Sequence, residues 1–313
     1  MKRILAVAGP TASGKSALAL HLAEKFDGEI ISFDSMQIYR GMDIGTAKPT
    51  KEEMSKITHR MIDIADPREN YSVADFVKKA DTEISKTLEN KKLPILCGGT
   101  GLYLDSYLRG MDFGKECSDE NYREELFCYY EENGADALHA MLCEKDPQAA
   151  EKIHKNNVKR VIRALEIIKA SGMTKTEWDM KALENSASRP CFIIGLNFKD
   201  REKLYSRIEK RVDIMISEGL TEEVENLYKN GLLQEGTTAA DAIGYKEMLL
   251  YIKGEISLDD AIGKIKLATR RYAKRQLTWF LRNTDIKWLY PDEYDTQEEL
   301  SRAADKLIYE NSN

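Results

Sequence analysis

The chain has 313 residues, of which 42% are hydrophobic and 32% are charged, and its formal net charge is −6 at pH 7. This composition is ordinary for a globular protein and excludes a largely disordered chain. No stretch approaches the ~18 consecutive apolar residues of a membrane helix, so we expect a cytoplasmic protein. The five cysteines include no Cys-x-x-Cys pair and the four histidines are far apart, which excludes a recognisable zinc finger.

The first third of the chain alternates strand-like and helix-like segments. An apolar run at 2–8 precedes a helical stripe at 15–26, and a second strand-like run follows at 29–33. Residues 73–89 carry apolar side chains at helical spacing and lead into a third strand-like run at 93–97. This alternation predicts an α/β fold with a parallel sheet flanked by helices.

The pattern changes in the middle of the chain. Strand-like runs are absent from 112–187, where short helical periods follow one another, and an apolar run at 191–197 then returns to the strand pattern. We therefore predict a core domain made of residues 1–111 and 188–313. Residues 112–187 are predicted to form an all-helical insertion domain.

Residues 9–16 fit the phosphate-loop pattern G-x-x-x-x-G-K-[ST] between a predicted strand and a predicted helix. Backbone amides and the helix N-terminus favour phosphate oxygens, Lys15 adds a positive charge, and the Ser16 hydroxyl can ligate Mg²⁺. The pattern predicts a site for a diphosphate or triphosphate. Its members are Gly9, Pro10, Thr11, Ala12, Ser13, Gly14, Lys15 and Ser16.

Asp34 follows the second predicted strand, at the edge where open α/β sheets place their ligands. It is a candidate general base or indirect magnesium ligand; the alternative is an aspartate that caps the following turn. The chain has no guanine-binding motif and the strand at 93–97 ends without an acid, so neither a GTPase nor an ATPase is indicated. Glycines at 98–101 indicate a second close approach of a ligand to the backbone.

Two segments carry several cations and no acids, and both indicate local binding of a polyanion despite the negative net charge. In the segment 152–165 we expect Lys152, Lys155, Lys159 and Arg163 to lie near one face of a helix. The segment 261–284 falls in a long helix predicted over 257–283, with Ser257 as its N-cap. The alternative for each segment is a solvated helix face.

Five aromatic residues near these segments have two interpretations. They could line a pocket or stack on a base, or they could belong to the core, which burial statistics favour. The residues are Tyr103, Tyr107, Phe113, Trp279 and Phe280.

Several motifs together resemble the tRNA dimethylallyltransferase (tRNA isopentenyltransferase) family. They are the phosphate loop, Asp34-Ser35-Met36-Gln37-Ile38-Tyr39 and Gly41-Met42-Asp43-Ile44-Gly45-Thr46-Ala47-Lys48-Pro49, with further matches at 59–63, 98–103, 159–166, 241–246 and 271–282. The resemblance spans essentially the whole chain and is to the bacterial type, which lacks the zinc-finger extension of eukaryotic members. It implies a core like that of the P-loop NTPases.

The resemblance implies transfer of a dimethylallyl group from dimethylallyl diphosphate to N6 of the adenosine 3′ of the anticodon, in tRNAs that read codons beginning with U. The implied partners are the anticodon stem-loop of tRNA and dimethylallyl diphosphate, for a monomer that needs no membrane. Mg²⁺ is the implied cofactor, with Ser16 as its ligand. Asp34 would orient and deprotonate N6, while Ser16 and Arg211, or its neighbour Arg207, would stabilise the leaving diphosphate.

The resemblance also implies a set of residues that meet tRNA. These are Asp34, Ser35, Met36, Gln37, Thr100, Arg123, Lys159, Arg160, Val161, Ile162, Arg163, Asp241, Gly244, Tyr245, Lys246, Lys274, Arg275 and Gln276. Some members carry a basic residue where this chain has Asp241-Ala242, a difference that weighs against a direct base contact there.

Three other functions remain open from the residues alone. A small-molecule kinase would use the phosphate loop for ATP, but leaves the basic segments unexplained. A prenyltransferase acting on free AMP, ADP or ATP would need no helical insertion. A non-catalytic RNA-binding module would bind tRNA without any diphosphate, which leaves the phosphate loop without a purpose.

Overall fold

The structure is a computed structural model that describes residues 4–111, 119–184 and 188–311. The chain divides into two compact units, residues 1–108 with 189–313 and residues 109–188. Both predicted limits of the insertion, 112 and 187, lie outside the described residues. Within the described part of the chain, no helix is both long and apolar enough to cross a membrane.

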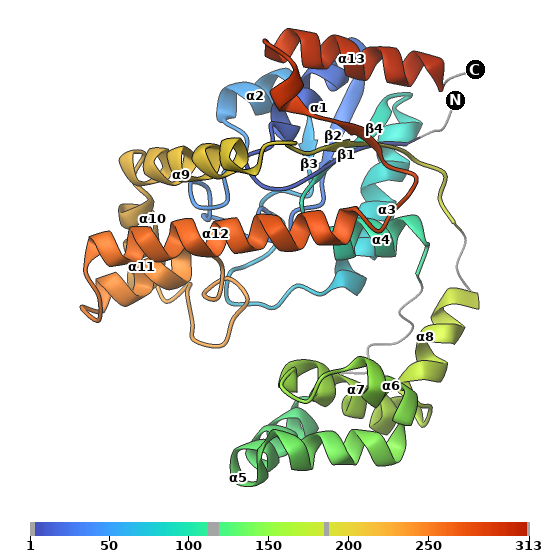
Figure 1. Cartoon of the computed structure of the whole chain (residues 1–313), viewed down its shortest axis with the longest axis vertical. Helices are drawn as coiled ribbons and strands as arrows, with labels where there is room; N and C mark the ends of the chain where they lie inside the picture. Colours follow the sequence, from blue (N-terminus) through green and yellow to red (C-terminus); the bar gives the residue numbers. More distant parts are fainter. Residues whose placement is uncertain (1–3, 112–118, 185–187, 312–313) are drawn as a thin grey trace. The chain divides into compact units, whose positions relative to one another are not determined.

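The larger unit is built on one parallel sheet of six strands, in the order β3-β2-β4-β1-β5-β6 (Figure 1). The strands are β1 (Leu5–Ala8), β2 (Gly28–Ser32), β3 (His59–Arg60), β4 (Leu93–Gly98), β5 (Phe192–Leu196) and β6 (Lys287–Leu289). The predicted parallel α/β sheet is therefore confirmed. The two edge strands, β3 and β6, were not predicted, because two or three residues are too few to give a strand pattern.

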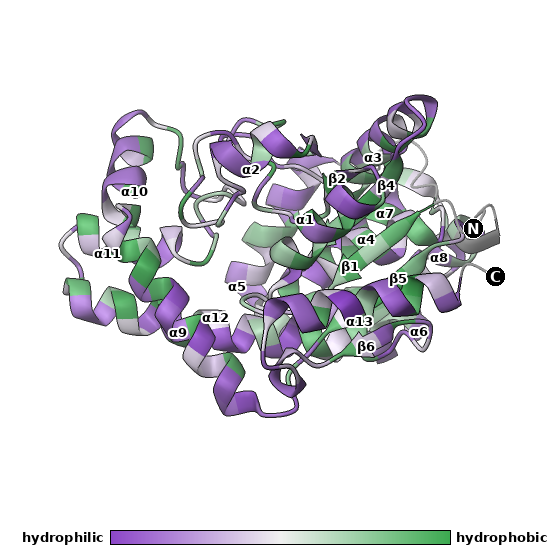
Figure 2. Ribbon diagram, turned by 90° about the horizontal axis from the view of Figure 1, so that it is seen from above, coloured by the Kyte–Doolittle hydropathy of each residue, from purple (hydrophilic) through white to green (hydrophobic). Residues whose placement is uncertain are grey.

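Helices cover both faces of the sheet. On one face α1 (Lys15–Lys25) and α13 (Gln297–Glu310) bury Leu18, Leu22 and Leu300 against side chains of β1 such as Leu5 and Val7. On the other, α3 (Val73–Glu89) packs against β2 and β4, and α4 (Gly101–Leu108) packs on α3. Figure 2 shows hydrophobic strands beneath helices that alternate in polarity, as burial of one helix face requires. The short elements are α2 (Lys51–Lys56) and η1 (Pro291–Glu293).

Four helices near the carboxyl ends of the strands form a second core in the same unit. They are α9 (Arg201–Ser217), α10 (Leu220–Lys229), α11 (Tyr245–Ile252) and α12 (Leu258–Phe280). Their apolar side chains enclose Ile38, Tyr39 and Met42, which follow β2. The Ser257 hydroxyl accepts a hydrogen bond from the Asp260 amide (3.1 Å), so Ser257 caps α12 as predicted.

The described part of the smaller unit is entirely helical. Its helices are α5 (Glu120–Lys145), which is interrupted at Gly134, α6 (Pro147–Lys152), α7 (Val158–Ser171) and α8 (Lys175–Glu184). They share a core that includes Leu138, Leu142 and Leu165. The prediction that Lys152, Lys155, Lys159 and Arg163 share one helix face is wrong, because the chain leaves α6 after Lys152 and begins α7 only at Val158.

Substitution of two glycines tests this packing, because we expect the two changes to shift the free energy of unfolding in opposite directions. A Cβ on Gly28 would lie 2.9 Å from the Leu93 carbonyl oxygen and 2.8 Å from Ile95 Cδ1, between β2 and β4. Gly263 lies inside α12 with open space around it. We expect Gly28→Ala to lower the free energy of unfolding by about 1–3 kcal/mol through overpacking, and Gly263→Ala to raise it by about 0.5–1 kcal/mol. Urea unfolding of both variants measures this, and equal effects would contradict the described packing.

Candidate active site

The phosphate loop joins β1 to α1 through two glycines that no other residue replaces easily. A Cβ on Gly9 would lie 2.5 Å from the Leu196 carbonyl oxygen, and Gly14 adopts φ +94° where it caps α1. Lys15 Nζ donates to the Pro10 carbonyl (2.7 Å), so the Lys15 side chain folds back on the loop. The loop thus leads into the N-terminus of α1, which favours an anion.

A basic cavity of about 390 Å³ lies beside this loop. Its walls are residues 12–17 and one face of α9, which contributes Arg207, Lys210, Arg211 and Ile214 at helical spacing. We call it the phosphate cavity. The four cations Lys15, Arg207, Lys210 and Arg211 line it without an acid, which suits a diphosphate. Lys210 was not predicted, although its spacing from Arg207 and Arg211 was available in the sequence.

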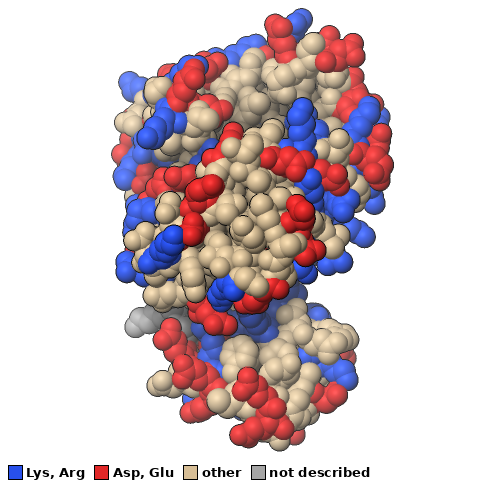
Figure 3. All heavy atoms as spheres, turned by 90° about the vertical axis from the view of Figure 1, so that its left-hand side faces the viewer, with Lys and Arg blue, Asp and Glu red and all other residues tan. Residues whose placement is uncertain are grey.

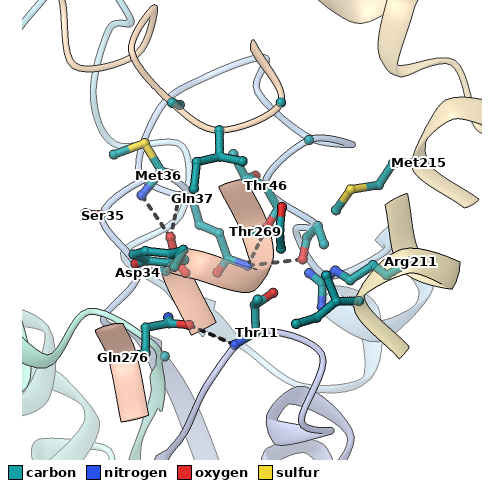
Figure 4. A pocket seen from close by; sticks show the side chains of 18 of the residues that line it. Thr11, Asp34, Ser35, Met36, Gln37, Thr46, Arg211, Met215, Thr269 and Gln276 are labelled. Carbon is teal, nitrogen blue, oxygen red and sulfur yellow. Dashed lines mark hydrogen bonds between the residues drawn. The ribbon is translucent and has the colours of Figure 1, made fainter. Parts of the chain in front are cut away.

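A second cavity, of about 340 Å³, contains Asp34 and is called here the acceptor cavity. Figure 4 shows Asp34, Gln37, Thr11 and Arg211 around it, brought together from separate segments of the chain. Lys15, Ser16 and Arg211 line both cavities. A group bound across these three residues would therefore face Asp34 on one side and the phosphate loop on the other.

The structure gives the two candidate arginines different surroundings. Arg207 Nε donates to the Ala12 carbonyl (2.9 Å), so Arg207 supports the shape of the phosphate loop. Arg211, one helical turn further along α9, lines both cavities and is half-buried. Arg211 is therefore the one placed to reach a group that passes between them.

Asp34 caps the turn that follows β2 and also lines the acceptor cavity. Its Oδ1 accepts hydrogen bonds from the amides of Met36 (2.9 Å) and Gln37 (3.4 Å). The Ser35 amide donates to Thr100 Oγ1 (3.0 Å), which ties this turn to the loop after β4. The two interpretations of Asp34 are thus compatible: the cap fixes one oxygen and orients the carboxylate in the cavity.

Burial shapes the protonation of the side chains around Asp34. It lowers the pKa of Lys15 to about 8 and also lowers the pKa of Arg211, although the Asp34 carboxylate opposes both shifts. It raises the pKa of Cys97 to about 11 and that of Tyr272 to about 12, so both stay protonated at neutral pH. An anion bound between the two cations would relieve the cost of burying their charges.

Helix α12 forms one wall of the acceptor cavity. Ile265, Thr269, Tyr272 and Gln276 lie along one face of the helix and all line the cavity. Gln276, a predicted RNA contact, is buried: its Oε1 accepts from the Thr11 amide and its Nε2 donates to the Gly99 carbonyl, both at 2.9 Å. The Gln276 side chain thus bridges the phosphate loop and the loop after β4, and its role as an RNA contact stays a prediction.

Burial also removes three predicted RNA contacts from the surface. Val161 and Ile162 belong to the core of the smaller unit, and Tyr245 belongs to the core around α9–α12. Their side chains pack against neighbours and are not available to RNA. In the smaller unit, Arg123 and Arg163 pair with the buried Glu166, at 3.0 and 3.6 Å.

The remaining predicted RNA contacts lie at the surface or in the acceptor cavity. Lys159, Arg160, Lys246 and Lys274 are exposed. The cavity is lined by Ser35, Met36, Gln37, Asp241, Gly244 and Arg275. Lys246 Nζ lies 3.7 Å from Asp241 Oδ1. Thr100 does not line this cavity and accepts a hydrogen bond from the Ser35 amide.

The basic segment of α12 is partly neutralised by α9. Lys266 pairs with Asp213 (2.6 Å) and Arg270 with Glu209 (3.0 Å), whereas Arg271, Lys274, Arg275 and Arg282 are exposed. Figure 3 shows one face of the molecule on which both signs of charge are interspersed. On this face, any attraction for a polyanion must therefore be local.

Three of the five aromatic residues, Tyr103, Tyr107 and Phe280, are buried. Tyr103 stacks on Phe76 with ring centroids 4.3 Å apart. Trp279 packs against Gly101 and donates from Nε1 to Asp105 (2.7 Å). Phe113 lies outside the described residues.

Comparison with known proteins finds a family model and relatives that match most of the chain. The family model described as IPP transferase matches residues 37–284. A tRNA dimethylallyltransferase of Caldanaerobacter subterraneus subsp. tengcongensis is 48% identical over 299 residues, which cover 95% of each chain. A Bacillus anthracis protein with the same name is 45% identical and covers all of this chain and 98% of its own.

Solved structures agree with the fold. The full-length tRNA isopentenylpyrophosphate transferase of Bacillus halodurans is 42% identical, with a TM-score of 0.71 over 98% of this chain and 96% of that one. A eukaryotic dimethylallyltransferase acting on tRNA is 28% identical, with a TM-score of 0.81 over 99% of this chain and 80% of that one. The phosphate loop, the sheet and these matches along nearly the whole length lead to one conclusion: the chain belongs to the IPP transferase family.

Proposed function

We propose that the protein is a tRNA dimethylallyltransferase. It transfers the dimethylallyl group of dimethylallyl diphosphate to N6 of the adenosine 3′ of the anticodon, in tRNAs that read codons beginning with U. The observation that carries this proposal is the pair of adjoining cavities that share Lys15, Ser16 and Arg211. One suits a diphosphate and the other holds a carboxylate, as a reaction between a diphosphate ester and an amine requires.

In the proposed reaction, N6 attacks C1 of the dimethylallyl group while the bond from C1 to the diphosphate oxygen breaks. The electron pair of that bond leaves with the diphosphate, where Lys15, Arg211 and the loop amides stabilise the developing charge. Asp34 accepts the proton that N6 loses. An exocyclic amine is a weak nucleophile, so we expect the fixed orientation of Asp34 to matter more than its basicity. The adenosine must leave its stack to reach this carboxylate.

The residues present also fit the proposed Mg²⁺. The Ser16 hydroxyl lines both cavities and the Asp34 carboxylate lines one, and Mg²⁺ prefers oxygen ligands and usually keeps phosphate and water oxygens among them. Ser16 would hold the ion and Asp34 would contact it indirectly. When bound, the ion would neutralise charge on the diphosphate.

The function is tested with unmodified tRNA, dimethylallyl diphosphate and Mg²⁺. We expect a single adenosine, 3′ of the anticodon, to gain the mass of one C5H8 unit, measured by mass spectrometry of nuclease digests. AMP and ATP are offered as rival acceptors in parallel reactions. Modification of the free nucleotides alone, or phosphoryl transfer from ATP, would contradict the proposal.

Asp34→Asn is the matched variant, because an amide oxygen can still accept from the Met36 amide. We expect the single-turnover rate to fall about a hundredfold or more, as loss of a general base does, while tRNA affinity stays within about twofold. Equal losses in rate and affinity would mean that Asp34 binds RNA rather than moving a proton.

The lowered pKa of Lys15 gives a second test. Above pH 8 the free protein loses the Lys15 proton, whereas bound diphosphate favours the charged ammonium, so binding takes up a proton. We expect affinity for inorganic diphosphate to fall by up to about tenfold per pH unit above 8, as linkage to one proton dictates. Calorimetry between pH 7 and pH 10 measures this. Lys15→Gln reports the titration of the ligand itself, and parallel profiles for the two proteins would contradict the prediction.

A further inference from the structure

One wall of the acceptor cavity is a loop of residues 43–48, called here the wall loop. Gly45, Thr46 and Ala47 line the acceptor cavity, and no residue of the loop lines the phosphate cavity. Ala47 adopts φ +46°, a conformation that costs free energy in a residue other than glycine. Such a loop needs contacts that hold it in place.

The outer side of the wall loop closes around the carboxylate of Glu223, which comes from α10. Oε2 accepts hydrogen bonds from the amides of Asp43 (2.9 Å) and Ile44 (2.8 Å), and Oε1 accepts from the Gly45 amide (3.2 Å). Three successive amides that converge on one anion form a nest. These bonds are charge-assisted and hence stronger than bonds between neutral groups.

Tyr245 completes this arrangement from α11. Its hydroxyl donates to Glu223 Oε1 (2.6 Å), and a Cβ on Gly45 would lie 2.5 Å from its ring. Burial, reinforced by the nearby Glu223 charge, raises the pKa of Tyr245 far above its ordinary value, so the hydroxyl remains a donor. The ring therefore limits how far the loop can move outward, and the hydroxyl orients the carboxylate.

The inner side of the wall loop is held by residues near Asp34. Gln37 Nε2 donates to the carbonyls of Thr46 (3.3 Å) and Ala47 (3.1 Å). The Ser32 hydroxyl donates to Gln37 Oε1 (2.9 Å) and fixes the amide. Gln37 follows Asp34 in the same turn, so the distance between the wall loop and Asp34 depends on both sets of bonds.

We infer that Glu223, oriented by Tyr245, is a positioning residue that sets the width of the acceptor cavity for the flat adenine ring. The inference rests on the proposed function for the identity of the acceptor. Neither side chain lines the cavity, so both act through the wall loop. The diphosphate site does not include this loop and should be unaffected.

Glu223→Gln tests the inference, because it keeps the size of the side chain but removes the charge and one acceptor. We expect faster hydrogen exchange at the amides of residues 43–45 and a KM for tRNA raised about tenfold, as loss of a charge-assisted bond predicts. We expect kcat to change less than about threefold and the affinity for inorganic diphosphate to stay unchanged. Tyr245→Phe should act in the same direction but more weakly, since it keeps the ring against Gly45.

Glu225→Gln is the matched control on the same helix, where Glu225 pairs with Lys229 at the surface (2.7 Å). It should leave exchange and KM unchanged. Unchanged exchange at residues 43–45 in Glu223→Gln would overturn the nest, and changed exchange with an unchanged KM would overturn the positioning role. A parallel loss of tRNA and diphosphate binding would also overturn it, because it would indicate general damage.

If the proposed function were wrong, the unsubstituted, folded protein would not modify tRNA. The affinity for an anticodon stem-loop RNA then decides the inference. Weaker binding by Glu223→Gln than by Glu225→Gln would support it, and equal binding would overturn it.

Discussion

The active site depends on one buried amide. Gln276 of α12 accepts from the Thr11 amide and donates to the Gly99 carbonyl, and so joins the phosphate loop to the loop after β4. A Cβ on Gly99 would lie 2.1 Å from Gln276 Nε2, so a larger residue here would displace the amide. Since α12 also carries Thr269 and Tyr272 into the acceptor cavity, this bridge fixes that wall relative to the site for the diphosphate.

In the proposed reaction, the phosphate loop holds a leaving group. Lys15 and Arg211 are both buried enough to have lowered pKa values, and both line the acceptor cavity together with Asp34. The charge of a diphosphate grows as the bond to carbon breaks, so cations placed here favour the transition state over the bound substrate. In the same proposal the proton moves to Asp34, which lines the acceptor cavity together with Lys15 and Arg211.

The parts of this arrangement that could be predicted are local in sequence. The phosphate loop, Asp34 at the end of β2 and the cap at Ser257 each depend on neighbouring residues, and the resemblance to a family added the substrates. Glu223 could not be predicted, because the amides it binds lie 178 to 180 positions away and only the fold brings them together. Val161, Ile162 and Tyr245 lie in stretches that resemble RNA-binding segments, yet their side chains build cores. Gln276 stands beside the exposed Lys274 and Arg275, but the helix turns it to the inside.

The most direct test of this account is Gln276→Met, which keeps the length of the side chain and removes both hydrogen bonds without adding charge. Affinities for inorganic diphosphate and for an anticodon stem-loop RNA would be measured together with the single-turnover rate. If Gln276 joins the two loops, we expect diphosphate binding to weaken and the single-turnover rate to fall about tenfold or more, because Thr11 and Gly99 lose buried hydrogen-bond partners. A loss confined to RNA affinity, with diphosphate binding intact, would contradict the account and restore Gln276 as a direct RNA contact.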